Sequence, residues 1–174
     1  ANFTWLQNVE AAELLLEKVF PLIREENSKV KVWIVGQHIP KEIMVNKSDD
    51  IIIDDLKEDD QESIRKAYFE SSVFVSPLKG PGGTRIKQLA AMAAKLPLVT
   101  TSVGAEGLEA TDGQNVIIRN NPEEISEAVL SVLKNEKLAK SIAENARTLV
   151  EEKFSWFTMS EYLDKIYEDT KNSK

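Results

Sequence analysis

The chain has 174 residues, 42% of them hydrophobic and 29% charged, which is typical of a folded globular protein. It contains no cysteine, and this excludes disulfides, thiolate zinc sites and cysteine nucleophiles. The formal net charge of −7 argues against general attraction to nucleic acid, which depends on clustered lysine and arginine. Because no apolar stretch is long enough to span a bilayer and no export signal is visible, we expect one cytoplasmic domain.

Apolar residues at helical spacing predict that the chain opens with an amphipathic helix. Pro21 is expected to kink this helix in its last turns, because proline cannot donate the backbone hydrogen bond. Two strands are expected next, one around residues 30–34, where side chains alternate, and one at 51–53. The apolar positions of the helix are Val9, Ala12, Leu16, Val19, Phe20 and Ile23.

Strands and helices alternate through the middle of the chain. Asp60 is expected to cap a helix that carries Ile64 and Tyr68, and the apolar run at 73–75 is expected to form a strand that ends at Pro77. Another helix and two apolar runs, at 98–101 and 116–118, follow. This order predicts an α/β fold in which a parallel sheet has helices on both faces, a Rossmann-like three-layer arrangement.

The last third of the sequence is helical by pattern. Asn121 and Glu124 form a capping box around Pro122 at the first helical position. Two more helices are expected, and Ser155 is placed as the cap of the terminal one. The side chains expected to face inward from that helix are Met159, Leu163 and Ile166.

Glycines mark the connection between the strand at 73–75 and the next helix. The connection reads Ser76-Pro77-Leu78-Lys79-Gly80-Pro81-Gly82-Gly83-Thr84-Arg85. Glycines let a ligand approach the backbone, and the free amides at a helix start favour an anion. The pattern matches neither the dinucleotide fingerprint nor the P-loop, so loop chemistry alone leaves a phosphate site and a structural turn open.

The loop and the sequence around it resemble the large group 1 family of retaining glycosyltransferases with the GT-B fold. The matching segments are residues 86–101, which contain Leu89-Ala90-Ala91-Met92-Ala93, then 102–108, 112–115, 145–147 and 154–156, with earlier matches at 20–23 and 34–36. The resemblance therefore covers nearly the whole chain. It implies that this chain is the C-terminal, donor-binding domain of a two-domain enzyme.

The same resemblance implies a substrate and a partner. The substrate would be a UDP- or GDP-sugar, held without a metal ion or a cofactor, and catalysis would require an N-terminal acceptor-binding domain. The residues implied to face the diphosphate are Gly82, Gly83, Thr84, Arg85 and Lys87. The residues implied to lie near the base and ribose are Asp54, Asp55, Leu56 and Ala90.

Two positions depart from the family pattern. Ala90 stands where members usually have a glutamate that holds the ribose hydroxyls, and Lys95 stands where they usually have glycine. Alanine cannot accept those hydrogen bonds, so we expect weakened donor binding. The alternative is a non-catalytic Rossmann-like module that has lost ribose recognition at Ala90. His38, the single histidine, is interpreted as a surface loop residue.

Overall fold

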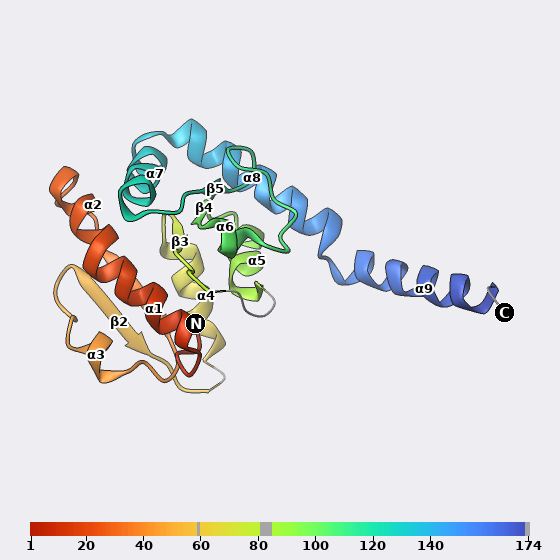
Figure 1. Ribbon diagram of the computed structural model, residues 1–174, viewed down its shortest axis with the longest axis horizontal. Coiled ribbons are helices and arrows are strands. Elements are labelled where there is room, and N and C mark those ends of the chain that lie inside the picture. The colour runs from red at the N-terminus through yellow and green to blue at the C-terminus, as the bar shows by residue number, and fades with distance from the viewer. Residues whose placement is uncertain (59, 81–84, 173–174) are drawn as a thin grey trace.

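Helices and parallel strands alternate along the computed structural model, which describes residues 1–58, 60–80 and 85–172 (Figure 1). The apolar runs predicted as strands form β1 (Val32–Gly36), β2 (Ile51–Asp55), β3 (Phe74–Ser76), β4 (Leu98–Thr100) and β5 (Ile117–Ile118). The helices between them are α3 (Lys41–Met44), α4 (Gln61–Glu70), α5 (Ile86–Ala93) and α6 (Ser102–Ala105). The predicted α/β class is confirmed.

All strand pairs of the described chain are parallel, but the ladders form two sheets. β1 pairs with β2, from Val32 opposite Ile51 to Gly36 opposite Asp55. β3, β4 and β5 form the other sheet, in that order. Within each sheet, parallel pairing brings the carboxyl ends of the strands to one edge, which is where ligands bind in open α/β folds.

The first helix changes from α-helical to π-helical geometry just before Pro21. α1 (Leu6–Leu14) continues into a π-helical segment, η1 (Leu15–Val19), and then into α2 (Phe20–Glu26). Pro21 lies in the first turn of α2 and lacks the N–H that would bond to the previous turn. The wider π turn is a known way to absorb such a missing bond. The π-helical segment lies one turn ahead of Pro21, and the kink expected at Pro21 stays a prediction.

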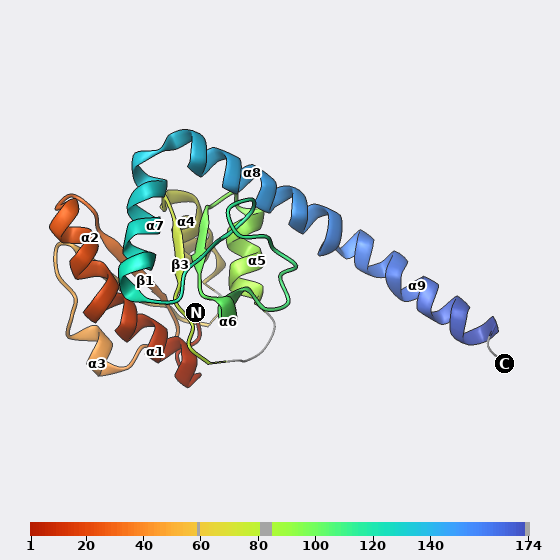
Figure 2. The ribbon, with the colours of Figure 1, turned by 45° about the horizontal axis from the view of Figure 1, so that its top comes forward.

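Both faces of β4 are covered, which establishes the three layers. Leu98 packs in a cluster with Met92 of α5 and Ala146 of a later helix, whereas Val99 packs in the cluster under the first helix. Successive side chains of a strand point to opposite faces, so full burial of both residues requires helices on each side. Figure 2 shows α7 on one side of the β3–β4 sheet and α5 on the other.

The C-terminal third forms α7 (Pro122–Lys134), α8 (Glu136–Lys153) and α9 (Trp156–Asn172). The predicted caps are confirmed: Asn121 Oδ1 accepts from Glu124 N–H at 2.9 Å, and Ser155 Oγ accepts from Thr158 N–H at 3.2 Å. α7 and α8 bury the apolar faces that the sequence indicates.

The prediction for α9 is wrong in one respect. Met159, Leu163 and Ile166 were expected to face inward, but all are exposed. Figures 1 and 2 show the reason, since α9 extends away from the rest of the domain. An amphipathic pattern specifies that a helix has an apolar face, but not which surface that face contacts.

Lys95 lies in the left-handed region, with φ of 57°. It follows α5 directly, where Lys95 N–H bonds to Met92 O at 3.1 Å and Leu96 N–H bonds to Ala91 O at 2.9 Å. This pattern closes a helix through a residue with positive φ, which is why glycine is favoured there. The lysine therefore stands at a helix-closing position where the backbone conformation favours glycine.

Lys95→Gly is expected to raise the free energy of unfolding by about 1 kcal/mol, because glycine adopts positive φ without the Cβ penalty. Urea denaturation would measure it. The matched control is Lys95→Ala, which removes the same exposed charge but keeps a Cβ and so gains little. Equal stability of the two variants would contradict the backbone explanation.

Candidate functional site

The glycine-rich loop joins the carboxyl end of β3 to the start of α5, as the sequence predicts. Gly82, Gly83 and Thr84 lie outside the described residues, so the site is built here from the segments on either side. Before the loop, Leu78 is buried; after it, Arg85 precedes the first turn of α5. The described ends of the loop thus lie at the carboxyl end of β3 and at the N-terminus of α5, where backbone dipoles favour an anion.

Arg85 and Lys87 are held at the base of the loop by residues from other elements. Arg85 is only 7% exposed, and its Nη2 donates to Val103 O of α6 at 2.6 Å. Lys87 Nζ donates to Asn8 Oδ1 of α1. The Tyr68 hydroxyl of α4 donates to Lys87 O at 3.0 Å. Elements distant in the sequence therefore fix both basic residues at this edge.

The amines of Lys87 and Ala1 lie near this edge and are partly shielded from water. Burial and, as the second cause, the charge of Arg85 together lower the pKa of Lys87 to about 8. Burial also lowers the pKa of the Ala1 amine to about 6, with Lys87 as the second cause, although Ala1 as a residue keeps solvent contact. A bound anion would favour the charged form of each amine and so raise both pKa values.

A buried polar network ties α5 to the strand ends. Gln88 Nε2 donates to Ser76 Oγ and to Thr100 Oγ1, each at 3.0 Å. Thr100 Oγ1 in turn donates to Ser76 O at 2.8 Å. Nearby, Thr101 Oγ1 donates to Leu78 O at 2.6 Å and accepts from Gly104 N–H at 3.0 Å. These bonds fix the position of α5 relative to the strand ends, and with it the positions of Arg85 and Lys87.

Sequence reasoning missed Gln88, Asn8 and Tyr68. Gln88 had a detectable signal, because it lies one helical turn before Ala91 and Met92, which share the buried face of α5 with it. Asn8 and Tyr68 had none, since their contacts with Lys87 join segments far apart in the chain.

The residues predicted to lie near the base are in the other sheet. Asp54 Oδ2 accepts from Trp33 Nε1 at 2.8 Å, and Asp55 Oδ1 accepts from Ile39 N–H at 3.2 Å. Leu56 N–H donates to Gly36 O at 2.6 Å, which extends the β1–β2 ladder. These residues end β2, so each half of the predicted site belongs to a different sheet. Ala90, the predicted ribose position, is half-buried on α5, one turn after Lys87.

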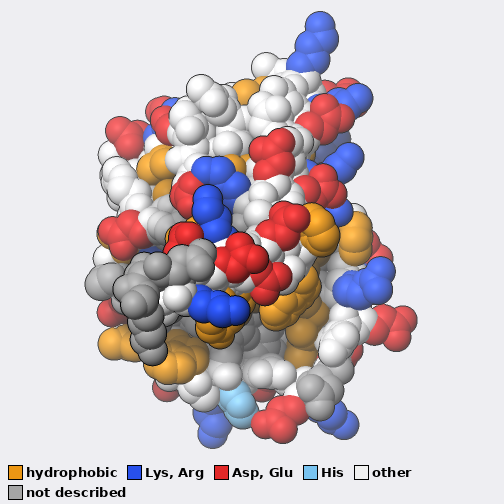
Figure 3. All heavy atoms as spheres, turned by 90° about the vertical axis from the view of Figure 1, so that its right-hand side faces the viewer, with side chains coloured by type: hydrophobic (Ala, Val, Ile, Leu, Met, Phe, Trp, Pro, Cys, Tyr) orange, Lys and Arg blue, Asp and Glu red, His pale blue; other side chains and the backbone are white. Residues whose placement is uncertain are grey.

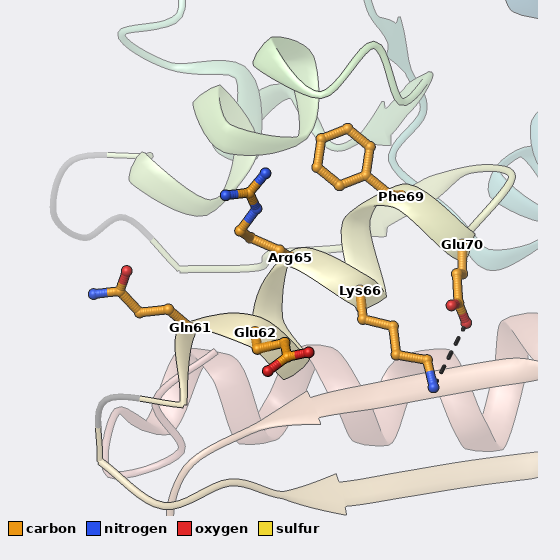
Figure 4. A pocket seen from close by; sticks show the side chains of 6 residues that line it. All are labelled: Gln61, Glu62, Arg65, Lys66, Phe69 and Glu70. Carbon is orange, nitrogen blue, oxygen red and sulfur yellow. Dashed lines mark ion pairs between the residues drawn. The ribbon is translucent and has the colours of Figure 1, made fainter.

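The exposed face of α4 carries a depression but no enclosed site. A shallow depression along α4 is lined by Gln61, Glu62, Arg65, Lys66, Phe69 and Glu70. Figure 4 shows these side chains splayed along a single helix, with Lys66 and Glu70 paired at 4.0 Å. Such an arrangement is an exposed helix face. Within the described ranges, no group of histidine and carboxylate side chains could hold a metal ion.

His38 is exposed, as expected, and appears in pale blue at the surface in Figure 3. The same view shows acidic and basic side chains mixed with hydrophobic ones, and no broad field of one sign. Among the described helices, none combines the length and the apolar composition needed to cross a bilayer.

The model of the family "Glycosyl transferases group 1" matches residues 1–135 of this chain. The chain belongs to that family, and its fold is that of a GT-B C-terminal domain. A curated relative, an uncharacterised 44.6 kDa protein from the cps region of Klebsiella pneumoniae, is 26% identical over 160 residues. That match covers 88% of this chain but 41% of the relative, so the chain spans well under half of the relative's length.

Solved structures show the same fold. The C-terminal domain of a group 1 glycosyltransferase from Francisella tularensis superposes with a TM-score of 0.71 at 19% identity, covering 84% of this chain and 82% of that domain. The Anabaena protein HepE, solved in complex with UDP-glucose, gives a TM-score of 0.72 at 14% identity. Here the match covers 87% of this chain and 44% of HepE.

Gly104 tests the network beneath the loop. A Cβ at this position would lie 2.1 Å from Thr100 Oγ1, which cannot retreat without breaking its bonds to Ser76 and Gln88. Gly104→Ala is therefore expected to lower the free energy of unfolding by about 2 kcal/mol in chemical denaturation. Gly80→Ala is the control, because a Cβ there meets no described atom within 4 Å. A change in Gly104→Ala no larger than in the control would show that the network can relax.

Proposed function

We propose that this chain is the donor-binding half of a glycosyltransferase that transfers a sugar from a nucleoside-diphosphate sugar. The observation that carries the proposal is the pair Arg85 and Lys87, desolvated cations held beside the glycine-rich loop at the start of α5. A diphosphate is an anion that two neighbouring cations can hold through charge-assisted hydrogen bonds. Membership of the group 1 family and the UDP-glucose complex of HepE support the assignment.

The proposed contacts follow the strand-edge geometry. Gly82, Gly83 and Thr84 would face the diphosphate through their backbone, with Arg85 and Lys87 adding charge. No metal ion is required, because these groups can neutralise the phosphates. The turn at residues 54–56 would flank the base. The structural support for this turn is its position at the carboxyl end of β2, on the edge where parallel folds bind ligands.

Catalysis would require a second domain. The chain covers 41% of its Klebsiella relative and 44% of HepE, which leaves room in such proteins for a domain of similar size. We propose that this further domain is the acceptor-binding half, N-terminal to Ala1 in the sequence. The 174-residue chain alone would then bind the donor without transferring the sugar.

The second candidate function is a non-catalytic binding module. Ala90 favours it, because a methyl group on the half-buried face of α5 cannot accept a ribose hydroxyl. Under this alternative the scaffold is kept, but donor binding is lost. The two candidates differ in a direct measurement, the affinity of the chain for UDP and GDP.

UDP binding is expected to weaken about tenfold between pH 7 and pH 9 in calorimetric titrations, because the protonated fraction of a lysine with a pKa of about 8 falls about tenfold there. The ligand-free protein should respond in the opposite direction. A lysine pKa below its usual value means that the unfolded chain binds more protons, so unfolding free energy rises from about pH 8 to 10.5.

Lys87→Met is the control for this prediction. It keeps an unbranched side chain but removes the titrating amine. Its UDP affinity should therefore be lower than that of the native chain at pH 7, and it should change little between pH 7 and pH 9. If the UDP affinities of the native chain and of Lys87→Met change with pH in the same way, Lys87 is not part of the binding site.

Ala90→Glu is expected to raise the affinity for UDP about tenfold, equivalent to about 1.4 kcal/mol, by restoring a charged acceptor for the ribose hydroxyls. The control ligand is 2′-deoxy-UDP, which lacks one of those hydroxyls and should gain less. If neither the native chain nor Ala90→Glu binds UDP or GDP, the donor-site proposal fails and the non-catalytic module is correct.

A further inference from the structure

The Lys87 amine is held by a neutral partner. Its Nζ donates to Asn8 Oδ1 of α1, and Asn8 Nδ2 in turn donates to Asn2 O at 2.6 Å, which fixes the amide. Lysines that form ion pairs in the described part of the chain are Lys47, Lys66, Lys134, Lys140 and Lys153. Loss of a proton therefore costs Lys87 no ion pair, and a remaining N–H can still donate to Asn8.

The titratable groups around this amine come from separate elements and do not oppose its neutral form. Arg85, just ahead of α5, repels a positive charge on Lys87. The Ala1 amine also interacts with Lys87, and it is mostly neutral above its pKa of about 6. The Tyr68 hydroxyl of α4 donates to Lys87 O, and burial raises the pKa of this phenol to about 12. Arg85 therefore favours the uncharged amine, and neither of the other two groups supplies a negative charge.

A lysine in this setting is a nucleophile near neutral pH. With a pKa of about 8, about a quarter of the Lys87 amines are unprotonated at pH 7.5, against about one in a thousand at the ordinary value of 10.5. Desolvation and a neighbouring cation are the two features that activate nucleophilic lysines in enzymes. Lys87 is half-buried and keeps some solvent contact, so a small reagent can reach it.

The charge beside the amine selects among acylating reagents. The protein as a whole carries a net charge of −7, but Arg85 places a positive charge next to Lys87. A local cation of this kind raises the concentration of a small anion near it. A reagent that joins an acyl group to a phosphate is therefore attracted by Arg85 and presents its carbonyl carbon to a nearby amine.

We propose that Lys87 is an acylation site and that its reagents are acyl phosphates. The Lys87 nitrogen attacks the carbonyl carbon, the bond from that carbon to the phosphate oxygen breaks, and inorganic phosphate leaves with the bonding electrons. The nitrogen loses one proton to water or phosphate. An uncharged amide replaces the amine, so the chain loses a positive charge at this position.

The acylation goes beyond the proposed function, because it requires no nucleotide. Its consequence for donor binding does rest on that function: an amide carries no charge for a diphosphate, so the acetylated chain should bind UDP about tenfold more weakly at pH 7. The two ideas can fail separately. If Lys87 is acetylated and the UDP affinity does not change, the acylation site is supported and the role of Lys87 in donor binding is wrong.

The test incubates the chain with acetyl phosphate at pH 7.5 and follows the acetylation of each lysine by peptide mass spectrometry. Lys79, an exposed lysine beyond the end of β3, is the internal reference, and the Ala1 amine is scored on its own peptide. Lys87 should be acetylated about tenfold or more faster than Lys79, because more of its amine is unprotonated. Acetylation of Lys87 no faster than that of Lys79 would overturn the proposal.

Acetic anhydride separates the reactivity of the amine from the attraction of the reagent, because the anhydride is uncharged. The ratio of Lys87 to Lys79 acetylation should be about threefold or more higher with acetyl phosphate than with the anhydride, since Arg85 attracts only the charged reagent. Equal ratios would overturn the assignment of acyl phosphates as the reagent class.

Asn8→Asp and Asn8→Ala are the matched variants. Aspartate places a carboxylate against the Lys87 amine and favours its protonated form, so acetylation of Lys87 should slow about tenfold while that of Lys79 is unchanged. Alanine removes only a neutral acceptor, so the Lys87 rate should stay within about threefold of the native rate. Equal Lys87 rates in the two variants would contradict the proposal, because the neutral partner would then not matter to the reaction.

Discussion

Parallel strand pairing is the constraint on which this domain depends. Strands that run the same way cannot be joined by tight turns, so a longer connection must cross between each pair. α5, which joins β3 to β4, forms part of one outer layer in this way. The same rule places the ends of neighbouring strands at one edge, where the glycine-rich loop and the start of α5 lie. The Gln88 network then holds the helix to that edge through Ser76 and Thr100. Fold and candidate site are thus consequences of one arrangement of backbone hydrogen bonds.

The candidate site is cationic in an acidic protein. A net charge of −7 would repel a nucleotide at long range, so recognition must come from local groups. Arg85 and Lys87 are the residues we propose for this role, because burial removes water that would otherwise screen their charges. Their contacts with α6 and α1 keep them in place before any ligand arrives. A site of this kind favours a small, highly charged anion over an extended polyanion.

Much of the fold could be predicted because it is encoded locally. The apolar runs that became β1 to β5 and the caps at Asn121 and Ser155 depend on residues within a few positions of one another. The loop was identified in the same way, from glycines between a strand and a helix. By contrast, the bond from Arg85 to Val103 and the contact of Lys87 with Asn8 are long-range, and no pattern specifies them. The division into two sheets was missed because a strand run does not reveal its neighbour.

Departures from the family pattern turned out to be of different kinds. Lys95 lies at a helix end with positive φ, so its effect is on backbone strain. Ala90 lies on the half-buried face of α5, so its effect would be on a ligand. Sequence comparison alone lists both as substitutions of equal standing. The backbone conformation separates them, because only the first requires a particular φ and only the second leaves an acceptor missing.

The projection of α9 gives the protein an internal spectroscopic reporter. Trp156, at its start, is 94% exposed, whereas Trp33 is half-buried and bonded to Asp54. Indole emission shifts to shorter wavelength when water is excluded from the ring. Any event that covers α9 should therefore shift the emission of Trp156, and a Trp156→Phe variant would isolate that contribution from the other tryptophans. Folding of the domain and burial of its terminal helix can thus be followed separately in one sample without an added label.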